Sequence, residues 1–217
     1  MGMSVSGMSL LMKVICMPVI FYYFKDVITG LGCSALARLS LRIISCRPLD
    51  YFLDRKEAIE NGGDDNDKYL QLLSLVGLED QRWPEDLLTR SAMALVLLGV
   101  LRSSGYFGKR PSSTHEPYSS QELFIGSLLL KHLQILQFNA HEVHEVLRGS
   151  ETNLKPSKNV GIGLAVYPTA SFINHSCHGG VARCFQGSRM VLKALRPIKA
   201  THEICDNYGP TFYLKAR

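Results

Sequence analysis

The sequence lacks the cysteine patterns of two common classes of small protein. Its six cysteines include no C-x-x-C pair, and most of them lie among apolar neighbours. A disulfide scaffold needs a regular cysteine framework in an oxidising compartment, and a self-contained zinc finger needs paired Cys and His ligands. The cysteines therefore predict reduced thiols in an intracellular protein.

Long hydrophobic runs are also absent. The uninterrupted apolar stretch from Val14 to Phe24 is shorter than the roughly 20 residues that a bilayer span needs. A signal peptide fits poorly, because the early base Lys13 lies well inside the apolar segment. Met1-Gly2 with Ser6 matches an acylation pattern, but one acyl chain without a basic patch binds membranes weakly. We expect no membrane partner, and a membrane-associated protein is a third alternative.

The net charge of +5 includes no dense Lys/Arg run at either end of the chain, and the sequence has no internal repeat or low-complexity tract. A nucleic-acid-binding arm normally needs such a basic run, so no direct nucleic-acid partner is predicted. A chain of 217 residues with 46% hydrophobic content is long enough to bury a real core.

Helical patterns extend over residues 34 to 148. Between Ser34 and Arg47, apolar residues recur about one turn apart, and Pro48 ends the predicted helix. The segment from Asn61 to Asp67 combines glycine, asparagine and aspartate, which predicts a solvated loop.

Two longer helices are predicted next. One has acidic residues at its N-terminal end and runs from Leu87 to about Leu101, and its nearly all-apolar surface predicts a buried helix. The other begins after Ser119, with Glu122 at capping-box spacing, and reaches about Gln137.

A short fourth helix is predicted from Ala140 to Arg148, with Asn139 as its N-cap. It would contain the run His141-Glu142-Val143-His144-Glu145. A zinc-protease helix needs the pattern His-Glu-x-x-His, and here a glutamate occupies the last place, so no metal site is predicted.

The last third of the chain predicts strands. Val181 to Gln186 and Arg189 to Leu195 are rich in strand-forming residues, and Gly187-Ser188 suits a two-residue hairpin turn. Helices followed by strands predict an α+β domain.

Two motifs lie on either side of this hairpin. Tyr167-Pro168 precedes the run Ser171-Phe172-Ile173-Asn174-His175-Ser176-Cys177, and the second motif runs Glu203-Ile204-Cys205-Asp206-Asn207-Tyr208-Gly209-Pro210. In this order they resemble the C-terminal half of a SET domain. The upstream helices resemble the helical insert of the SET-and-MYND (SMYD) family, most closely its tetratricopeptide-bearing member.

The resemblance covers residues 31 to 217 and implies three parts. Residues 1–30 would be an apolar segment of open role, residues 31–150 the helical insert region, and residues 151–217 the C-terminal SET core. That core would be β-rich and knot-like, because the two motifs of this family pass by each other. The implied protein is intracellular, in the cytoplasm, the nucleus or both.

The resemblance also implies a function, which is S-adenosylmethionine-dependent protein-lysine N-methylation. The cofactor would be S-adenosyl-L-methionine, and the partner a histone or non-histone protein with a lysine side chain. Asn139 and Asn174 would contact the cofactor, and His175 would contact its adenine mainly through backbone. Tyr208 would line both the cofactor site and the lysine channel, where it would orient the amine for catalysis.

Each of these residues has a simpler alternative. Asn139 could serve only as a helix cap, and Asn174 and His175 could serve only to satisfy backbone groups in a turn. Tyr208 could be a core aromatic residue with its hydroxyl satisfied, because Asn-Tyr-Gly-Pro is also an ordinary turn sequence.

Several parts of the family pattern are missing from the sequence. These are the early glycine-rich strand segment, the zinc-binding MYND module and a cysteine cluster expected beyond Arg217. Without that cluster Cys177 has no zinc to bind, so a free thiol is predicted. Gly179-Gly180 stand where the family has Pro-Asn, which predicts a looser turn. A truncated chain with an incomplete site is expected, and the alternative function is a non-catalytic SET-like interaction module.

Overall fold

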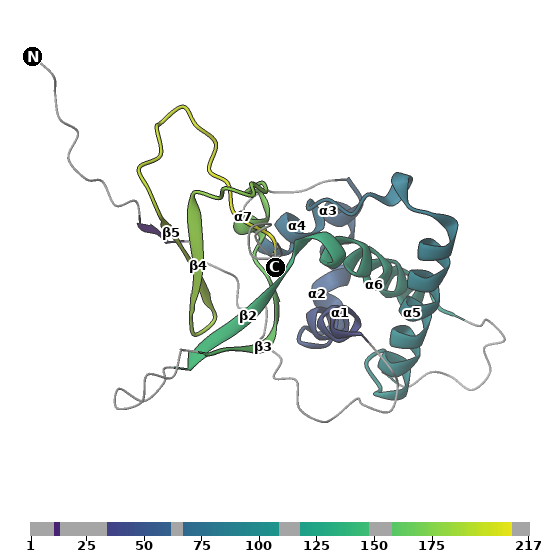
Figure 1. The fold of residues 1–217 in the computed structure, drawn as a ribbon. Helices are drawn as coiled ribbons and strands as arrows, with labels where there is room; N and C mark the ends of the chain where they lie inside the picture. Colours follow the sequence, from purple (N-terminus) through teal and green to yellow (C-terminus); the bar gives the residue numbers. More distant parts are fainter. Residues whose placement is uncertain (1–10, 14–33, 62–66, 109–117, 148–157, 210–217) are drawn as a thin grey trace, which may run out of the picture. The chain divides into compact units, whose positions relative to one another are not determined.

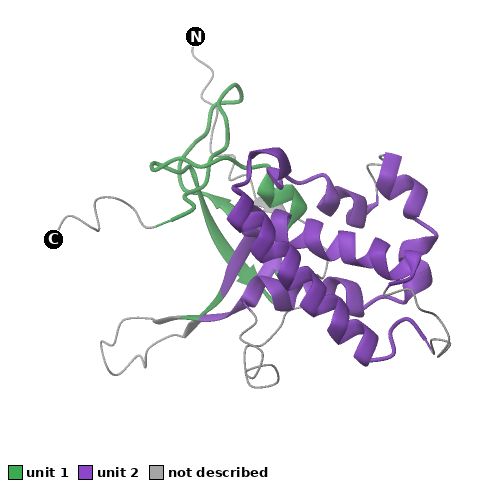
Figure 2. Ribbon diagram, turned by 90° about the vertical axis from the view of Figure 1, so that its right-hand side faces the viewer, with its two compact units in different colours: residues 1–19, 144–160, 167–217 green, residues 20–143, 161–166 purple. Residues whose placement is uncertain are grey.

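The chain folds into two compact units, which a computed structural model describes over residues 11–13, 34–61, 67–108, 118–147 and 158–209 (Figures 1 and 2). The helical unit comprises residues 20–143 and 161–166, and the strand unit comprises residues 1–19, 144–160 and 167–217. The apolar stretch from Val14 to Phe24 and the centre of the predicted loop from Asn61 to Asp67 lie outside the described residues.

The helical unit opens with short helices whose ends follow from local capping. The predicted first helix is confirmed as α1, Ala35–Ser45, and the Ser34 side chain accepts a hydrogen bond from the Ala37 amide. Further along, Asp67 caps α4 by accepting from the amides of Tyr69 and Leu70. The remaining short elements are α2, Leu49–Leu53; α3, Lys56–Asn61; α4, Lys68–Leu73; and the 3-10 helix η1, Glu79–Gln81.

Two long helices form the body of this unit. They are α5, Pro84–Ser103, and α6, Ser120–Asn139, which pack against each other and against α1 (Figure 1). The predicted capping box is confirmed, because Glu122 N donates to Ser119 Oγ and Ser119 N donates to the Glu122 carboxylate. Both helices occur where the sequence predicted them.

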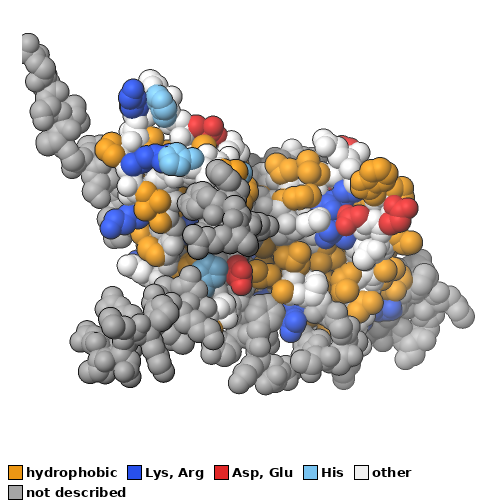
Figure 3. All heavy atoms as spheres, in the orientation of Figure 1, with side chains coloured by type: hydrophobic (Ala, Val, Ile, Leu, Met, Phe, Trp, Pro, Cys, Tyr) orange, Lys and Arg blue, Asp and Glu red, His pale blue; other side chains and the backbone are white. Residues whose placement is uncertain are grey.

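The expectation of a fully buried α5 is wrong. Ala94, Leu97, Leu98 and Leu101 are buried on one side, whereas the side chains of other apolar residues are exposed: Leu88 at 72%, Leu95 at 54% and Val96 at 44%. The helix packs against α6 and α1 through its buried side, and apolar side chains elsewhere on it are in contact with water. Hydrophobic side chains gather over this part of the surface (Figure 3).

A polar pair lies inside the helical core. The hydroxyl of Tyr69 lies 3.0 Å from His132 Nε2, and both residues are buried. Burial, with smaller contributions from the cations of Arg47 and Lys131, lowers the pKa of His132 to about 3. The ring is therefore neutral at physiological pH.

The predicted helix from Ala140 to Arg148 is a strand instead. This strand is β2, Ala140–Leu147, and it pairs with β3, Lys158–Val166, so the helical region ends at Asn139. In this extended strand Val143 is buried and the neighbouring Glu142 is exposed. Pairing with β3 outweighs the local helix signal.

The strand unit contains the predicted hairpin. Strands β4, Val181–Gln186, and β5, Arg189–Ala194, pair antiparallel, and Gly187 in their turn has a φ of 57°, which favours glycine. Strand β1, Leu11–Lys13, pairs antiparallel with the other edge of β5. The predicted α+β fold class is confirmed. Among the described residues, no helix is long and apolar enough to span a membrane.

Candidate functional site

The two sequence motifs pair with each other in the strand unit. Helix α7, Pro168–Ser171, leads into the first motif, in which His175 lies opposite Asp206 in a parallel β-bridge. Asp206 N donates to Asn174 O at 2.9 Å, and Ser176 N donates to Asp206 O at 2.8 Å. Residues separated by about thirty positions in the chain are thereby held side by side.

The Gly179-Gly180 turn is braced rather than loose, so this part of the sequence prediction is wrong. Gly180 N donates to Cys205 O at 2.8 Å, and Gly180 O accepts from Leu195 N at 2.9 Å. A Cβ atom at Gly179 would lie 3.0 Å from the amide nitrogen of Asn207, closer than most real Cβ contacts. Glycine at position 179 therefore allows the turn that follows the first motif to lie close to the backbone of the second motif.

A partly buried ion pair joins the second motif to the hairpin. The Asp206 side chain is only 10% exposed, and its Oδ2 lies 2.9 Å from Arg183 Nε on β4. Arg183 Nη2 also donates to Asn207 O at 3.1 Å, and Asp206 Oδ1 accepts from Asn207 N at 2.7 Å. Neither Arg183 nor Asp206 was predicted to have a role at the site. The available signal was Asp206 itself, an acidic residue immediately before Asn207-Tyr208.

Asn174 is exposed, and its carboxamide lies beside an acidic side chain. Its Nδ2 donates to Glu203 Oε1 at 2.6 Å. This contact orients the amide so that its nitrogen faces the carboxylate of the second motif. The carbonyl oxygen of Asn174 and the carboxylate of Glu203 together suit a cationic ligand group.

The imidazole of His175 connects the two motifs. Its Nδ1 accepts a hydrogen bond from the backbone amide of Tyr208 at 3.1 Å, and its Nε2 lies 3.3 Å from Cys177 Sγ. A backbone amide can only donate, so Nδ1 carries no proton, and in the neutral ring the proton is on Nε2. In this parallel bridge the backbone hydrogen bonds to Asp206 are made by Asn174 and Ser176, the residues on either side of His175. The backbone N–H and C=O of His175 itself therefore point away from Asp206.

Tyr208 is held at both its backbone and its hydroxyl. Its Oη donates to the carbonyl of Ile173, and its ring centroid lies 5.3 Å from that of His175. Burial, and next the carboxylate of Asp206, raise the pKa of Tyr208 above its ordinary value. The phenol is therefore protonated at neutral pH, although the residue is 53% exposed. It is not a fully buried core residue.

Asn139 belongs to the helical unit and is the last residue of α6. It is 8% exposed, and its Nδ2 donates to Ile135 O at 2.8 Å and to Val76 O at 2.9 Å. The structure thus brings Asn174, His175 and Tyr208 together in one unit and places Asn139 in the other. Asn139 is not the N-cap that the sequence predicted.

Among the described residues, Cys46, Cys177, Cys184 and Cys205 form no disulfide bond, and Cys177 is exposed. Cys16 and Cys33 lie outside the described residues. Within the described part of the chain, no group of three or more His, Cys, Asp or Glu residues could hold a metal ion.

The fold and these paired motifs agree with comparisons to known families. A sequence model of the SET domain family matches residues 43–209. The chain therefore belongs to the SET domain family.

Relatives from three organisms refine this assignment. The protein-lysine N-methyltransferase SMYD4 of Gallus gallus is 28% identical over 144 residues, which are 65% of this chain and 19% of that protein. SMYD4 of Mus musculus is 28% identical over 87 residues, covering 39% of this chain and 11% of that protein. A SET and MYND domain-containing protein of Dictyostelium discoideum is 42% identical over 53 residues, covering 24% of this chain and 4% of that protein.

These matches confirm the resemblance to the SET-and-MYND family, in which the two vertebrate relatives are named as protein-lysine methyltransferases. The alignments span 19% or less of the length of each relative. They relate this chain to one part of those proteins.

Proposed function

We propose that this chain carries part of an S-adenosylmethionine-dependent protein-lysine N-methyltransferase site. The observation that carries the proposal is the parallel bridge between His175 and Asp206, because it collects polar groups from two distant motifs at one place. Asn174 and His175 would hold the cofactor there, and Tyr208 would face both the cofactor and the substrate lysine. Asn139 would contribute a further cofactor contact.

The residues present suit this cofactor chemically. Its amino-acid end carries an ammonium group, which matches the Asn174 carbonyl oxygen beside the Glu203 carboxylate. Its adenine has donor and acceptor groups, which match the outward N–H and C=O of His175. When bound, S-adenosylmethionine supplies a methyl group activated by a sulfonium.

Tyr208 would orient the substrate amine. Its hydroxyl hydrogen is used in the bond to Ile173 O, so the hydroxyl oxygen is left as an acceptor for an N–H of the lysine amine. When the Tyr208 oxygen accepts one N–H of the amine, the direction of the nitrogen lone pair is fixed. The amine must be neutral for this, because a protonated amine has no lone pair. The raised pKa of Tyr208 keeps the phenol protonated, so positioning rather than proton removal is its role.

Isothermal titration with S-adenosylmethionine tests the cofactor assignment. The wild-type chain should bind saturably, and Asn174→Ala should weaken binding by about tenfold, because a charged hydrogen bond is lost. Asn61→Ala, an exposed asparagine on α3, is the matched control and should bind like wild type. Equal affinities for all three proteins would reject Asn174 as a cofactor contact.

Methyl transfer to a lysine peptide tests the role of Tyr208. Tyr208→Phe should keep the cofactor dissociation constant within about twofold and slow transfer by roughly a hundredfold, as for loss of a positioned polar group. The comparison uses mass spectrometry of the peptide under single-turnover conditions. Unchanged transfer in Tyr208→Phe would exclude the hydroxyl from the reaction.

A second function is a non-catalytic protein-interaction module, which the exposed apolar side chains of the helical unit favour. Trp83 is 78% exposed and Leu88 is 72% exposed. Exposed apolar groups of this size are common at protein interfaces. A folded wild-type chain that shows no heat of binding at millimolar S-adenosylmethionine would support this function over catalysis.

A further inference from the structure

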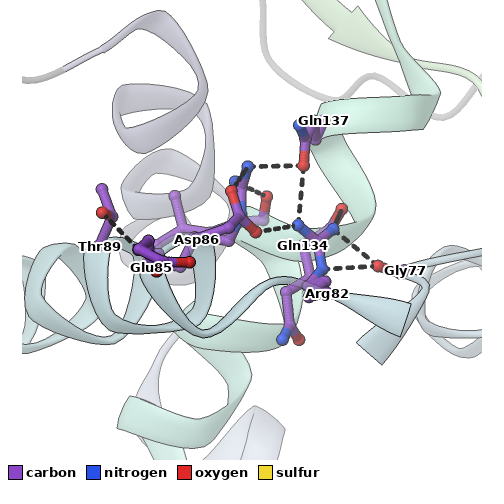
Figure 4. A network of polar contacts seen from close by, with 9 residues as sticks. Gly77, Arg82, Glu85, Asp86, Thr89, Gln134 and Gln137 are labelled. Atoms are coloured by element: carbon purple, nitrogen blue, oxygen red, sulfur yellow. Dashed lines mark hydrogen bonds and ion pairs between the residues drawn. The ribbon is translucent and has the colours of Figure 1, made fainter. Parts of the chain in front are cut away.

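The side chain of Arg82 is almost completely buried in the helical unit and forms five hydrogen bonds (Figure 4). Its Nε and Nη2 donate to Gly77 O at 2.9 and 2.6 Å, and Nη2 also donates to Gln134 O at 2.8 Å. Its Nη1 donates to Asp86 Oδ2 at 2.5 Å and to Gln137 Oε1 at 2.8 Å. A guanidinium has five N–H groups, and each of them has an acceptor here.

The positive charge of Arg82 is compensated on α5. Asp86 accepts from Arg82 and also from Arg90, whose Nε lies 2.8 Å from Asp86 Oδ2. Hydrogen bonds from Arg90, and next from Arg82, lower the pKa of Asp86 to about 2. Arg90 Nη1 also donates to Leu133 O at 2.8 Å. Both guanidinium groups therefore contact the C-terminal half of α6, where a helix favours cations.

Arg82 and Asn139 join the same two segments, which are the backbone at Val76-Gly77 and the C-terminal part of α6. Arg82 joins Gly77 O to Gln134 O, and Asn139 Nδ2 joins the neighbouring carbonyls, Val76 O and Ile135 O. The two bridges are thus offset by one residue in each segment. A change in the spacing between these segments would alter the orientation of the Asn139 carboxamide.

The segment that follows Gly77 does not hold its position by local preference alone. Leu78 has a φ of 54°, in the left-handed region that a leucine rarely adopts. A residue in this conformation persists where surrounding contacts fix it. The two Arg82 bonds to Gly77 O supply such contacts immediately before Leu78.

We infer that Arg82 is the positioning residue for Asn139 and fixes the orientation of that carboxamide. The effect on cofactor affinity rests on the proposed function, whereas the effect on the Asn139 amide does not. Lysine cannot replace arginine here, because an ammonium group cannot bond the carbonyls of Gly77 and Gln134 and the Asp86 carboxylate in the same geometry.

Nuclear magnetic resonance of the ¹⁵N-labelled full chain tests the positioning directly. The Asn139 side-chain amide signals are identified by their loss in Asn139→Ala. Arg82→Met should shift these signals and accelerate their hydrogen exchange by at least about tenfold, since the Val76 bond is weakened. Arg90→Met, which removes a guanidinium that contacts α6 and Asp86 but not Gly77, should leave them in place.

Arg82→Lys is a second variant, for the case in which Arg82→Met does not fold. It keeps a positive charge beside Asp86 and should therefore preserve folding. Both variants should change the Asn139 signals in the same way. Unchanged signals in Arg82→Lys, or equal changes in Arg90→Met, would overturn the inference.

The affinity for S-adenosylmethionine provides the second readout. Arg82→Met should raise the dissociation constant by about tenfold, and the double variant Arg82→Met, Asn139→Ala should bind no worse than Asn139→Ala alone. Additive losses would show that Arg82 acts independently of Asn139 and would overturn the inference. If the wild-type chain does not bind the cofactor, the proposed function fails, and the amide signals still decide the positioning role.

Discussion

At the scale of single residues, close backbone approach explains more of the candidate site than side-chain chemistry does. The motifs Asn174-His175-Ser176-Cys177 and Asn207-Tyr208 could be recognised in the sequence because both are short local patterns, and in the structure they pair. The role of Arg82 could not be predicted. Its acceptors on α6 are a backbone carbonyl 52 residues away and a glutamine amide 55 residues away, and neither leaves a sequence signal.

Gly179 shows how strongly the site depends on this approach. Gly179→Ala should destabilise the strand unit by about 1 to 3 kcal/mol, because the new Cβ would press on the backbone of Asp206 and Asn207. Urea denaturation followed by circular dichroism measures the change. Gly99→Ala in α5, where nothing lies within 4 Å of the added Cβ, is the control and should be stabilising by about 0.5 to 1 kcal/mol. Equal stability of Gly179→Ala and wild type would contradict the close approach.

At the scale of elements, the structure agrees with the sequence wherever the signal is local. The Ser119 and Glu122 capping box and the Gly187 turn were predicted because each depends on a few adjacent residues. The strand β2 was not predicted, because its conformation depends on pairing with β3, and Asn139 imitated an N-cap in the sequence. The exposed side of α5 was missed because hydrophobic content alone does not reveal how many neighbours a helix has.

The start of α6 provides a test at this scale. Ser119→Ala should lower the free energy of unfolding by about 1 kcal/mol, because the Glu122 amide loses its acceptor and the capping box is broken. Thermal unfolding measured by circular dichroism reports the loss. Ser119→Asp keeps an acceptor at the same position and should retain most of the stability. A similar loss in both variants would mean that the hydroxyl has another function.

At the scale of the whole molecule, burial of a neutral imidazole should govern the response to acid. His132 has a pKa of about 3 when folded and 6.5 ordinarily, so the unfolded chain binds more protons between these values. The free energy of unfolding should therefore fall as pH decreases from about 6.5, by up to about 1.4 kcal/mol per pH unit. Asp86, with a pKa of about 2, contributes its own loss only below about pH 3.8.

Chemical denaturation at several pH values between 4 and 8 tests this expectation. His132→Gln should flatten the dependence, even though it also lowers stability by disturbing the contact with Tyr69. His178→Gln changes an exposed histidine and should keep the wild-type slope. A slope that survives in His132→Gln would assign the acid response to another group.

The small strand β1 has a consequence for solubility. It places Leu11, Met12 and Lys13 along β5, opposite Lys193, Leu192 and Val191, so β5 is the central strand of its sheet. Removing residues 1–13 would turn β5 into an unprotected edge, with unpaired amide and carbonyl groups that invite strands from other molecules. A chain shortened in this way should self-associate at concentrations at which the full chain does not, and sedimentation velocity would show the difference.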